Sequence, residues 1–168
     1  DEVADLVFVY KYIDCIVESV FEDTQTIVFK ESNKFGNQKN LVLDDEKKDY
    51  EIYTSVGILA DFSIIDEDSV ISIAQSSDGE IIRIVVGVPK FEGVVTAKDG
   101  DYIILDNTEY LCNDAELVKS LKLGTKVTGY LSFMNTLVGY EEIKSAQMYG
   151  YVYAYSISGS WGEYKVKM

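Results

Sequence analysis

FEGVVTAKDGDYIILDNTEYLC, residues 91–112, divides into three short apolar runs separated by two turn signals. The turn signals are KDGD at 98–101 and LDNTEY at 105–110, where Gly, Asn and Asp accept the backbone conformations that hairpin turns require. The runs between them are rich in Val, Ile and Tyr, which favour extended structure. The stretch therefore predicts three consecutive antiparallel strands, near 91–98, 101–106 and 109–112.

The same pattern of short apolar runs and polar turns continues on both sides of this stretch. Thirteen Tyr, seven Phe and many Val and Ile residues give the whole chain a β-rich composition, so we predict an all-β fold. One segment, DAELVKSL at 114–121, predicts a short helix, and Leu117, Leu121 and Leu123 are expected to close one end of the unit. Further strands are expected near 6–20, 25–30, 40–43, 49–53, 69–75, 80–87, 126–133, 137–143, 148–157 and 161–167.

The opening residues of the quoted stretch recur elsewhere in the chain. GVVTA from Gly93 aligns with CIVES from Cys15 and with GYVYA from Gly150. A second match aligns DSVISIAQ at 68–75 with TKVTGYLS at 125–132. These matches predict an internal repeat.

The repeat and the single proline, Pro89, predict the domain organisation. Pro89 lies between two apolar strands, and proline cannot donate a hydrogen bond to a strand ladder, so it suits a boundary. We predict tandem small antiparallel β-barrel or sandwich modules with a C-terminal β-hairpin, which either starts a third module or docks on the second. The predicted boundaries are 1–88, 90–147 and 148–168.

The alternation within the repeat predicts which side chains face inward. Side chains of a strand alternate between its two faces. The small or apolar set is expected inside: Cys15, Val17 and Ser19, then Gly93, Val95 and Ala97, then Gly150, Val152 and Ala154. The other set is expected outside or partly covered: Ile16 and Glu18, then Val94 and Thr96, then Tyr151 and Tyr153. Two cysteines are too few for a disulfide framework, so Cys15 and Cys112 are predicted to be buried, unpaired and far apart.

Composition excludes several classes of function. A net charge of −14 opposes binding to nucleic acid and to anionic membrane surfaces, and no apolar run is long enough for membrane insertion. The chain has no His, which excludes a Ser-His-Asp triad and His-ligated zinc. The acidic clusters at 44–49, 66–68 and 99–101 are interpreted as solvated turns rather than calcium loops. No cofactor, metal site or catalytic residue is predicted, and a carboxylate-pair hydrolase is the weakest hypothesis.

The C-terminal segment MYGYVYAYSISGSWGEYKVKM contains the candidate binding residues. Tyrosines at every second position share one face of a strand, where they form a flat aromatic surface. Two interpretations are open: the rings stack on a glycan, or they cover a neighbouring module. The candidate residues are Tyr149, Tyr151, Tyr153, Tyr155, Trp161 and Tyr164.

Several segments resemble a known group of proteins. LVFVYKYIDCIVESV at 6–20, LVLDDEKKDYEI at 41–52, DSVISIAQSSDGEIIRIVV at 68–86 and the stretch at 91–112 resemble the β-rich regions of clostridial cell-surface proteins that carry S-layer-homology domains. The resemblance implies an extracellular, wall-associated location and transfers no catalytic residues. We therefore expect part of a longer chain, acting as a non-catalytic structural or adhesive module. Its expected partners are neighbouring modules of the same protein or a cell-wall polymer. The alternative is a carbohydrate-binding module that uses the C-terminal tyrosine face.

Overall fold

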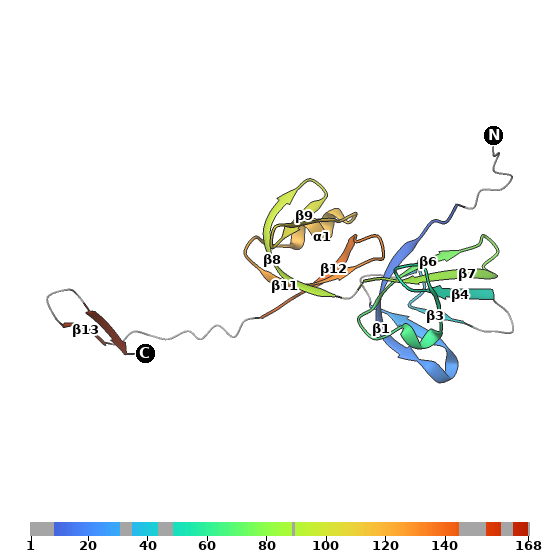
Figure 1. Ribbon diagram of the computed structural model, residues 1–168, viewed down its shortest axis with the longest axis horizontal. Helices are drawn as coiled ribbons and strands as arrows, with labels where there is room; N and C mark the ends of the chain where they lie inside the picture. The colour runs from blue at the N-terminus through green and yellow to red at the C-terminus, as the bar shows by residue number, and fades with distance from the viewer. Residues whose placement is uncertain are drawn as a thin grey trace.

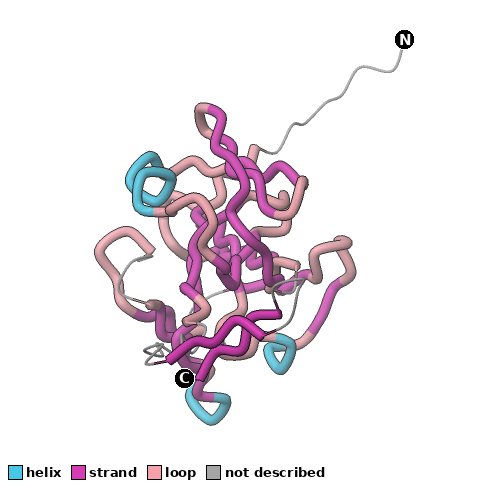
Figure 2. The backbone as a smooth tube through the Cα atoms, turned by 90° about the vertical axis from the view of Figure 1, so that its left-hand side faces the viewer, coloured by secondary structure: helices cyan, strands magenta, loops and turns pink. Residues whose placement is uncertain are grey.

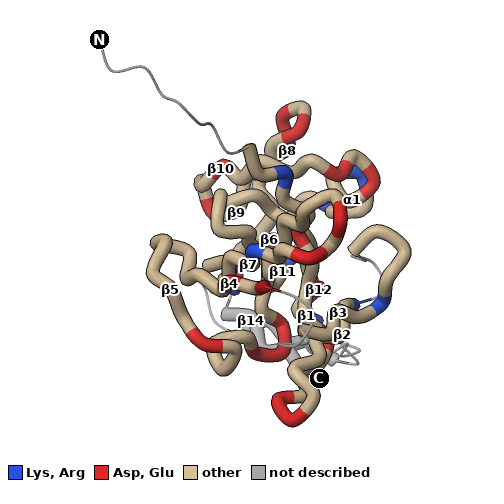
Figure 3. Tube along the Cα trace, turned by 90° about the vertical axis from the view of Figure 1, so that its right-hand side faces the viewer, with Lys and Arg blue, Asp and Glu red and all other residues tan. Residues whose placement is uncertain are grey.

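The computed structural model describes residues 9–30, 35–43, 49–88 and 90–144, together with the backbone of two strands at 154–158 and 163–167. Two β-sheets lie side by side in Figure 1. Strands make up most of the described chain, and the helices are short (Figure 2). The predicted β class is confirmed. Asp and Glu occupy many of the turns and loops around both sheets (Figure 3).

The first sheet has seven strands and the second has five. The first sheet contains β1 (Ile13–Phe21), β2 (Thr26–Phe29), β3 (Asn40–Val42), β4 (Asp49–Tyr53), β5 (Leu59–Ala60), β6 (Val70–Gln75) and β7 (Ile81–Val86). The second contains β8 (Phe91–Asp99), β9 (Tyr102–Leu105), β10 (Thr108–Leu111), β11 (Lys126–Leu131) and β12 (Leu137–Glu142). Helix α1 spans Ala115–Ser120, and two 3-10 turns span Glu22–Thr24 and Phe62–Ile64.

The two sheets share an order of strands. The first runs β3-β2-β1-β6-β7-β4-β5 and the second runs β10-β9-β8-β11-β12. Without β4 and β5, the first sheet has the connectivity of the second, strand for strand. The change of sheet falls between Val86 and Phe91, around Pro89, which lies outside the described residues. That the two parts are separable modules stays a prediction.

The pairing registers of the two sheets also share an irregularity at equivalent positions. The β1–β2 ladder shifts between Val17 and Ser19, and the β8–β9 ladder shifts between Val95 and Ala97, which are equivalent positions of the repeat. A β-bulge therefore bends the first strand of both sheets at the same place.

The register also corrects the second sequence match by one residue. Cys15 pairs with Ile71, and its counterpart Gly93 pairs with Val127. Ile71 is therefore equivalent to Val127, whereas the sequence match placed Val70 there. A shift of one residue exchanges the two faces of a strand, so only the structural alignment superposes inward residues.

Two features differ from the predicted antiparallel barrels or sandwiches. Strand β4 pairs with β7 in parallel, with Asp49 opposite Ile81, so the first sheet is mixed. Among the described strands, no ladder closes either sheet into a barrel. In the second sheet a single parallel bridge, Leu111 to Thr136, connects the end of β10 to the residue before β12.

The predicted inward faces are confirmed at four positions of the first two repeats, whereas Ser19 and Ala97 are half-buried. Gly150 and Val152 lie outside the described residues. Cys15, Val17, Gly93 and Val95 are buried, and Glu18 and Thr96 of the opposite face are exposed. Each sheet has its own core of buried residues, the first around Ile27, Phe29, Ile71, Ile73, Ile82 and Ile84, and the second around Val95, Ile103, Leu105, Leu121 and Val127.

The two cysteines are free and buried, one in each core, as predicted. Burial and the neighbouring Asp14 carboxylate raise the pKa of the Cys15 thiol to about 12, and burial also raises the pKa of Cys112. Because the thiolate is the reactive form, we expect neither cysteine of the folded protein to react with a thiol reagent at pH 7. Denaturation without reductant should expose two thiols; a count of zero would contradict the unpaired assignment.

Helix α1 follows β10 as the sequence predicts. The Asp114 carboxylate accepts hydrogen bonds from the backbone N–H groups of Glu116 (2.9 Å) and Leu117 (3.3 Å), which caps the first turn. Leu121 is buried in the second core, with Leu117 packed against it. The prediction for Leu123 is wrong, because its side chain is 64% exposed beyond the end of the helix.

Strands β13 (Ala154–Ser158) and β14 (Glu163–Lys167) pair antiparallel with each other. Ala154 is opposite Lys167, and Ser158 is opposite Glu163. The role of this strand pair as the start of a third module stays a prediction.

Candidate functional site

On the outer face of the first sheet the predicted exposure of the repeat is wrong. Ile16 was expected outside, yet its side chain is only 3% exposed. Every residue of β6 from Val70 to Ala74 is also buried, so this strand is covered on both faces. The second sheet provides the cover: Ile16 and Val70 pack with Tyr130 of β11 and Val138 of β12. We call this contact the junction.

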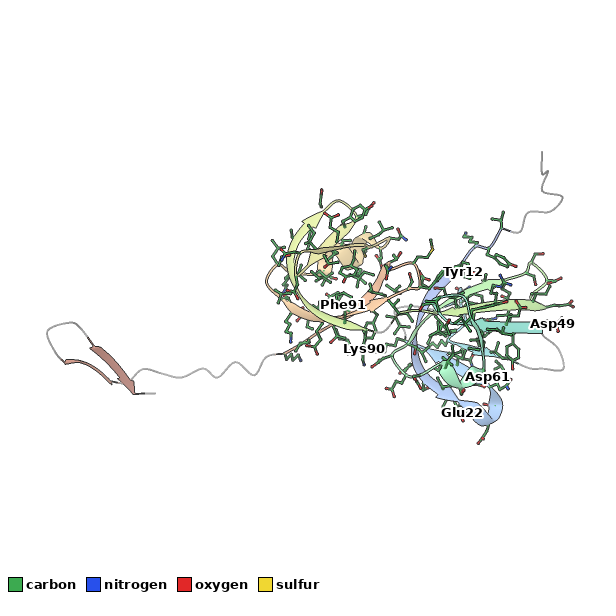
Figure 4. All side chains as sticks on the ribbon, viewed as in Figure 1. Tyr12, Glu22, Asp49, Asp61, Lys90 and Phe91 are labelled. Carbon is green, nitrogen blue, oxygen red and sulfur yellow. The ribbon has the colours of Figure 1, made fainter. Side chains whose placement is uncertain are left out.

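Close backbone approach allows the two sheets to meet. A Cβ atom on Gly139 would lie 2.5 Å from Cδ1 of Ile16. A Cβ atom on Gly87, directly after β7, would overlap the carbonyl oxygen of Leu131 and lie 3.0 Å from that of Val70. Gly87 therefore sits between backbone atoms of both sheets, where glycine alone fits. Lys90 and Phe91 lie where the two groups of side chains meet (Figure 4).

A lysine at the edge of the junction joins the two sheets by charge. The Lys30 ammonium lies 2.7 Å from Oδ1 of Asp68, in the turn before β6, and 2.7 Å from Oε1 of Glu141, in β12 of the second sheet. It also lies 4.9 Å from the centroid of the Tyr130 ring. Lys90 pairs with the second oxygen of Asp68 at 2.9 Å. Asp68 therefore binds two lysines, and Lys30 binds two carboxylates.

The pKa values of these groups follow from their contacts. Partial burial acts to lower the pKa of Lys30, but hydrogen bonds to Asp68 and Glu141 outweigh it and raise the pKa well above its ordinary value. The hydrogen bond from Lys30 lowers the pKa of Asp68, with a further contribution from Lys90. The same lysine and then Tyr130 lower the pKa of Glu141. Folding thus favours the charged form of all three groups.

We expect the junction to weaken in acid. Since the native pKa values of Asp68 and Glu141 are lowered, their contribution to stability is complete above their ordinary pKa of about 4. It is lost as the pH falls through the lowered native values. Burial raises the pKa of Asp14 despite the hydrogen bond that its carboxylate accepts from Ser72. Protonation of Asp14 therefore favours the folded state as the pH falls, which partly offsets this loss of stability.

The measurement is the free energy of unfolding between pH 7 and pH 3. Stability should fall over this range in the wild-type protein and fall less in Lys30→Met, which removes the cation that both carboxylates share. Equal pH dependence in the two proteins would contradict this assignment.

A cleft opens next to the junction on the same outer face. Its cavity has a volume of about 300 Å³. Tyr12 and Phe133 line one part of it, and their rings meet edge to face with centroids 5.2 Å apart. Its other lining residues are Tyr53, Thr54, Ser55, Gly57, Arg83 and Val85. We call this cavity the aromatic–arginine cleft. Phe133 belongs to the second sheet's β11–β12 loop, so the cleft is built from both sheets.

Arg83 is held in a fixed position in this cleft. Its Nη2 donates to Glu51 Oε2 at 2.8 Å, and the rings of Tyr10 and Tyr53 lie on the guanidinium with centroids 4.4 and 4.8 Å from Cζ. The Tyr53 hydroxyl donates to the same Glu51 oxygen at 3.0 Å. The hydrogen bond to Glu51 raises the pKa of Arg83, and the hydrogen bonds from Arg83 and Tyr53 lower the pKa of Glu51. The two charges therefore neutralise each other at neutral pH.

The binding residues predicted from the sequence are not tested by the structure. Tyr149, Tyr151, Tyr153 and Trp161 lie outside the described residues, and Tyr155 and Tyr164 are described only as backbone positions of β13 and β14. Val152 also lies outside them.

In the acidic cluster at 66–68, Asp68 has lysine partners rather than a metal site. Asp68 of the cluster at 66–68 binds Lys30 and Lys90, and residues 44–48 lie outside the described residues. In the ranges that the structure describes, no three acidic or cysteine side chains are placed to hold a metal ion together.

Sequence reasoning did not identify the junction or the aromatic–arginine cleft. Two features of the sequence are consistent with these sites. Arg83 is the one arginine of the sequence and interrupts the apolar run of β7. The run VISIA of β6 lacks the alternation of a half-exposed strand, which is typical of a strand buried on both faces.

No family model, curated protein or solved structure matches the chain. None of the helices in the described part of the chain has the length and apolar character that spanning a membrane requires.

Proposed function

We propose that the chain is a non-catalytic structural or adhesive segment of an extracellular, wall-associated surface protein, and that its two sheets are copies of one five-stranded unit. The common strand order and the bulge at equivalent positions support the duplication. In the second unit a helix follows the third strand and a parallel bridge links the third and fifth. This arrangement supports a partly open, five-stranded barrel of the OB type. In the first unit, β4 and β5 form an insertion.

The observation that carries the structural role is burial at the junction. Ile16 and Val70 are 3% and 2% exposed, which requires the second unit to remain in contact with the outer face of the first. Covering an isoleucine and a valine stabilises the contact by about 1.5–3 kcal/mol for each side chain. A segment with one fixed arrangement of units suits a spacer that holds neighbouring modules at a set distance and orientation.

The C-terminal strand pair supports a third copy of the unit. In the first two copies the residue directly after the bulge, Ser19 or Ala97, pairs with a residue of the second strand. Ala154 is the equivalent residue of the third repeat. The three pairs are Ser19 with Val28, Ala97 with Ile104, and Ala154 with Lys167. By this register Val166 is equivalent to Ile27 and Ile103, which are buried in the first two copies.

Antibody labelling of intact cells that carry this sequence tests the proposed location and role. We expect labelling of unbroken cells and its loss after mild protease treatment of the cell surface. Labelling that appears only after lysis would contradict the extracellular assignment. Release of soluble fragments from isolated cell walls by the purified chain would contradict the non-catalytic part.

A further inference from the structure

We infer that the aromatic–arginine cleft is a binding site for a neutral sugar ring. Its volume of about 300 Å³ is at the lower end of the range for small-molecule sites, about 300–1,000 Å³. It combines aromatic walls with a small number of polar groups, which is the usual composition of such sites. The cleft differs from the C-terminal tyrosine face in position and in residues.

The charges of the cleft favour a neutral ligand. Arg83 is the one cationic residue among those that line it, and Glu51 compensates its charge at 2.8 Å. The chain as a whole carries a net charge of −14, which repels phosphate, sulfate and acidic sugars. Since Glu51 is itself paired, the cleft offers no free carboxylate to a cation either.

The lining groups suit the two kinds of surface that a sugar presents. The ring faces of a sugar carry C–H bonds, which contact aromatic side chains such as Tyr12 and Phe133. Its hydroxyl groups both donate and accept hydrogen bonds, as do the hydroxyls of Tyr12, Thr54 and Ser55. The Arg83 guanidinium adds N–H donors at the same cavity.

The backbone of the cleft is less suited to an extended peptide. A peptide that adds to a sheet needs free N–H and C=O groups along one strand. Three N–H groups of the turn after β4 donate hydrogen bonds within the turn. Thr54 N–H donates to the carbonyl oxygen of Ile58, and Gly57 N–H donates to that of Thr54. Ile58 N–H donates to Oγ1 of Thr54. These donors are therefore already used, and recognition falls to side chains.

Both sides of the cleft are preorganised. Gly57 adopts a φ of +81°, which lets the turn after β4 close tightly. On the other side, Ser132 Oγ accepts from the N–H groups of Met134 and Thr136, both at 3.3 Å, and Ser132 N–H donates to Thr136 O at 3.0 Å. These bonds fix the loop that carries Phe133. A ligand therefore loses little affinity to ordering of the site.

The test is an array of neutral oligosaccharides of glucose, galactose, mannose and N-acetylglucosamine, followed by calorimetric titration of the strongest binder. We expect Phe133→Ala and Tyr12→Ala to weaken binding about tenfold or more, since each removes an aromatic contact. Phe133→Leu keeps an apolar side chain against Tyr12 and should also weaken binding, with an unchanged melting temperature. Tyr102→Ala, an exposed tyrosine of β9 outside the cleft, is the matched control and should bind as the wild type does.

Three results would overturn the inference. The first is an array with no neutral binder. The second is preferential binding of acidic sugars or peptides at this cleft. The third is sugar binding that survives Phe133→Leu and is lost in Tyr151→Ala with Tyr153→Ala, which would place the site at the C-terminal tyrosines. None of these results changes the cell-surface labelling that tests the proposed function, so the two proposals fail independently.

Discussion

Gly87→Ala should lower the free energy of unfolding by about 2–3 kcal/mol, the upper part of the range for overpacking a buried site. The added methyl group would overlap the carbonyl oxygen of Leu131 and approach that of Val70. Backbone atoms cannot move aside as a flexible side chain can, so the two units must separate. The φ of Gly87 lies outside the left-handed region, and alanine is otherwise compatible with its backbone.

Urea denaturation followed by circular dichroism measures this effect. The matched control is Gly100→Asn in the β8–β9 turn, where φ is +57° and no atom lies within 4 Å of the Cβ position. Asparagine tolerates this conformation, so the control should change stability by less than about 1 kcal/mol. If Gly87→Ala and the control lose the same small amount, Gly87 is not confined between the two units.

Lys30→Met should destabilise the protein by about 1.5–3 kcal/mol, the range for hydrogen bonds to charged groups. Methionine keeps most of the aliphatic stem but removes the ammonium that joins Asp68 to Glu141. The Lys30 and Asp68 side chains are 26% and 24% exposed, so solvent screens this pair less than a surface pair, whereas the Glu141 side chain is 59% exposed and its pair with Lys30 is screened more. Glu141 lies on the second unit, and its loss of a partner weakens the junction itself.

The matched control for Lys30→Met is Lys126→Met. Lys126 forms an ion pair of the same length, 2.7 Å, with Glu92, but the two side chains are 52% and 59% exposed. Exposed pairs contribute between about 0 and 1 kcal/mol, so this variant should be nearly neutral. A double-mutant cycle with Glu141→Gln isolates the interaction across the junction. A coupling energy near zero would show that Lys30 acts within the first unit alone.

Features that depend on neighbours in the sequence were predictable. The strands of residues 91–112 follow from alternating apolar residues and turn signals, and β8, β9 and β10 lie where expected. Helix α1 follows from Asp114 at its N-cap. The inward positions of Cys15 and Gly93 follow from the repeat, because small or apolar residues recur on one face.

Features that depend on distant segments were not predictable. Parallel pairing of β4 with β7 joins residues about thirty positions apart, and no local pattern specifies it. Ile16 alternates as an outer residue should, and only the second unit makes its position interior. Lys30 is one of 15 basic residues in a chain with 29 acidic ones, so composition does not reveal its partners.

The aromatic–arginine cleft was not predictable for the same reason. Its residues come from four segments, before β1, around the turn after β4, from β7 and from the β11–β12 loop. A sequence pattern can mark Arg83 as unusual, but the contact between Tyr12 and Phe133 exists only when both units are docked. The sequence therefore directed attention to a row of regularly spaced tyrosines, whereas the described cleft is assembled from dispersed ones.

The central claim is that the junction holds the two units in one arrangement, and a distance measurement by pulsed electron paramagnetic resonance tests it most directly. Nitroxide labels on Asp23→Cys and Glu109→Cys, both at exposed positions, report one distance from the first unit to the second. The buried native thiols should not react with the label. We predict a single narrow distance distribution at neutral pH, which broadens when Gly87→Ala is added. A broad distribution without Gly87→Ala, unchanged by its addition, would contradict the account.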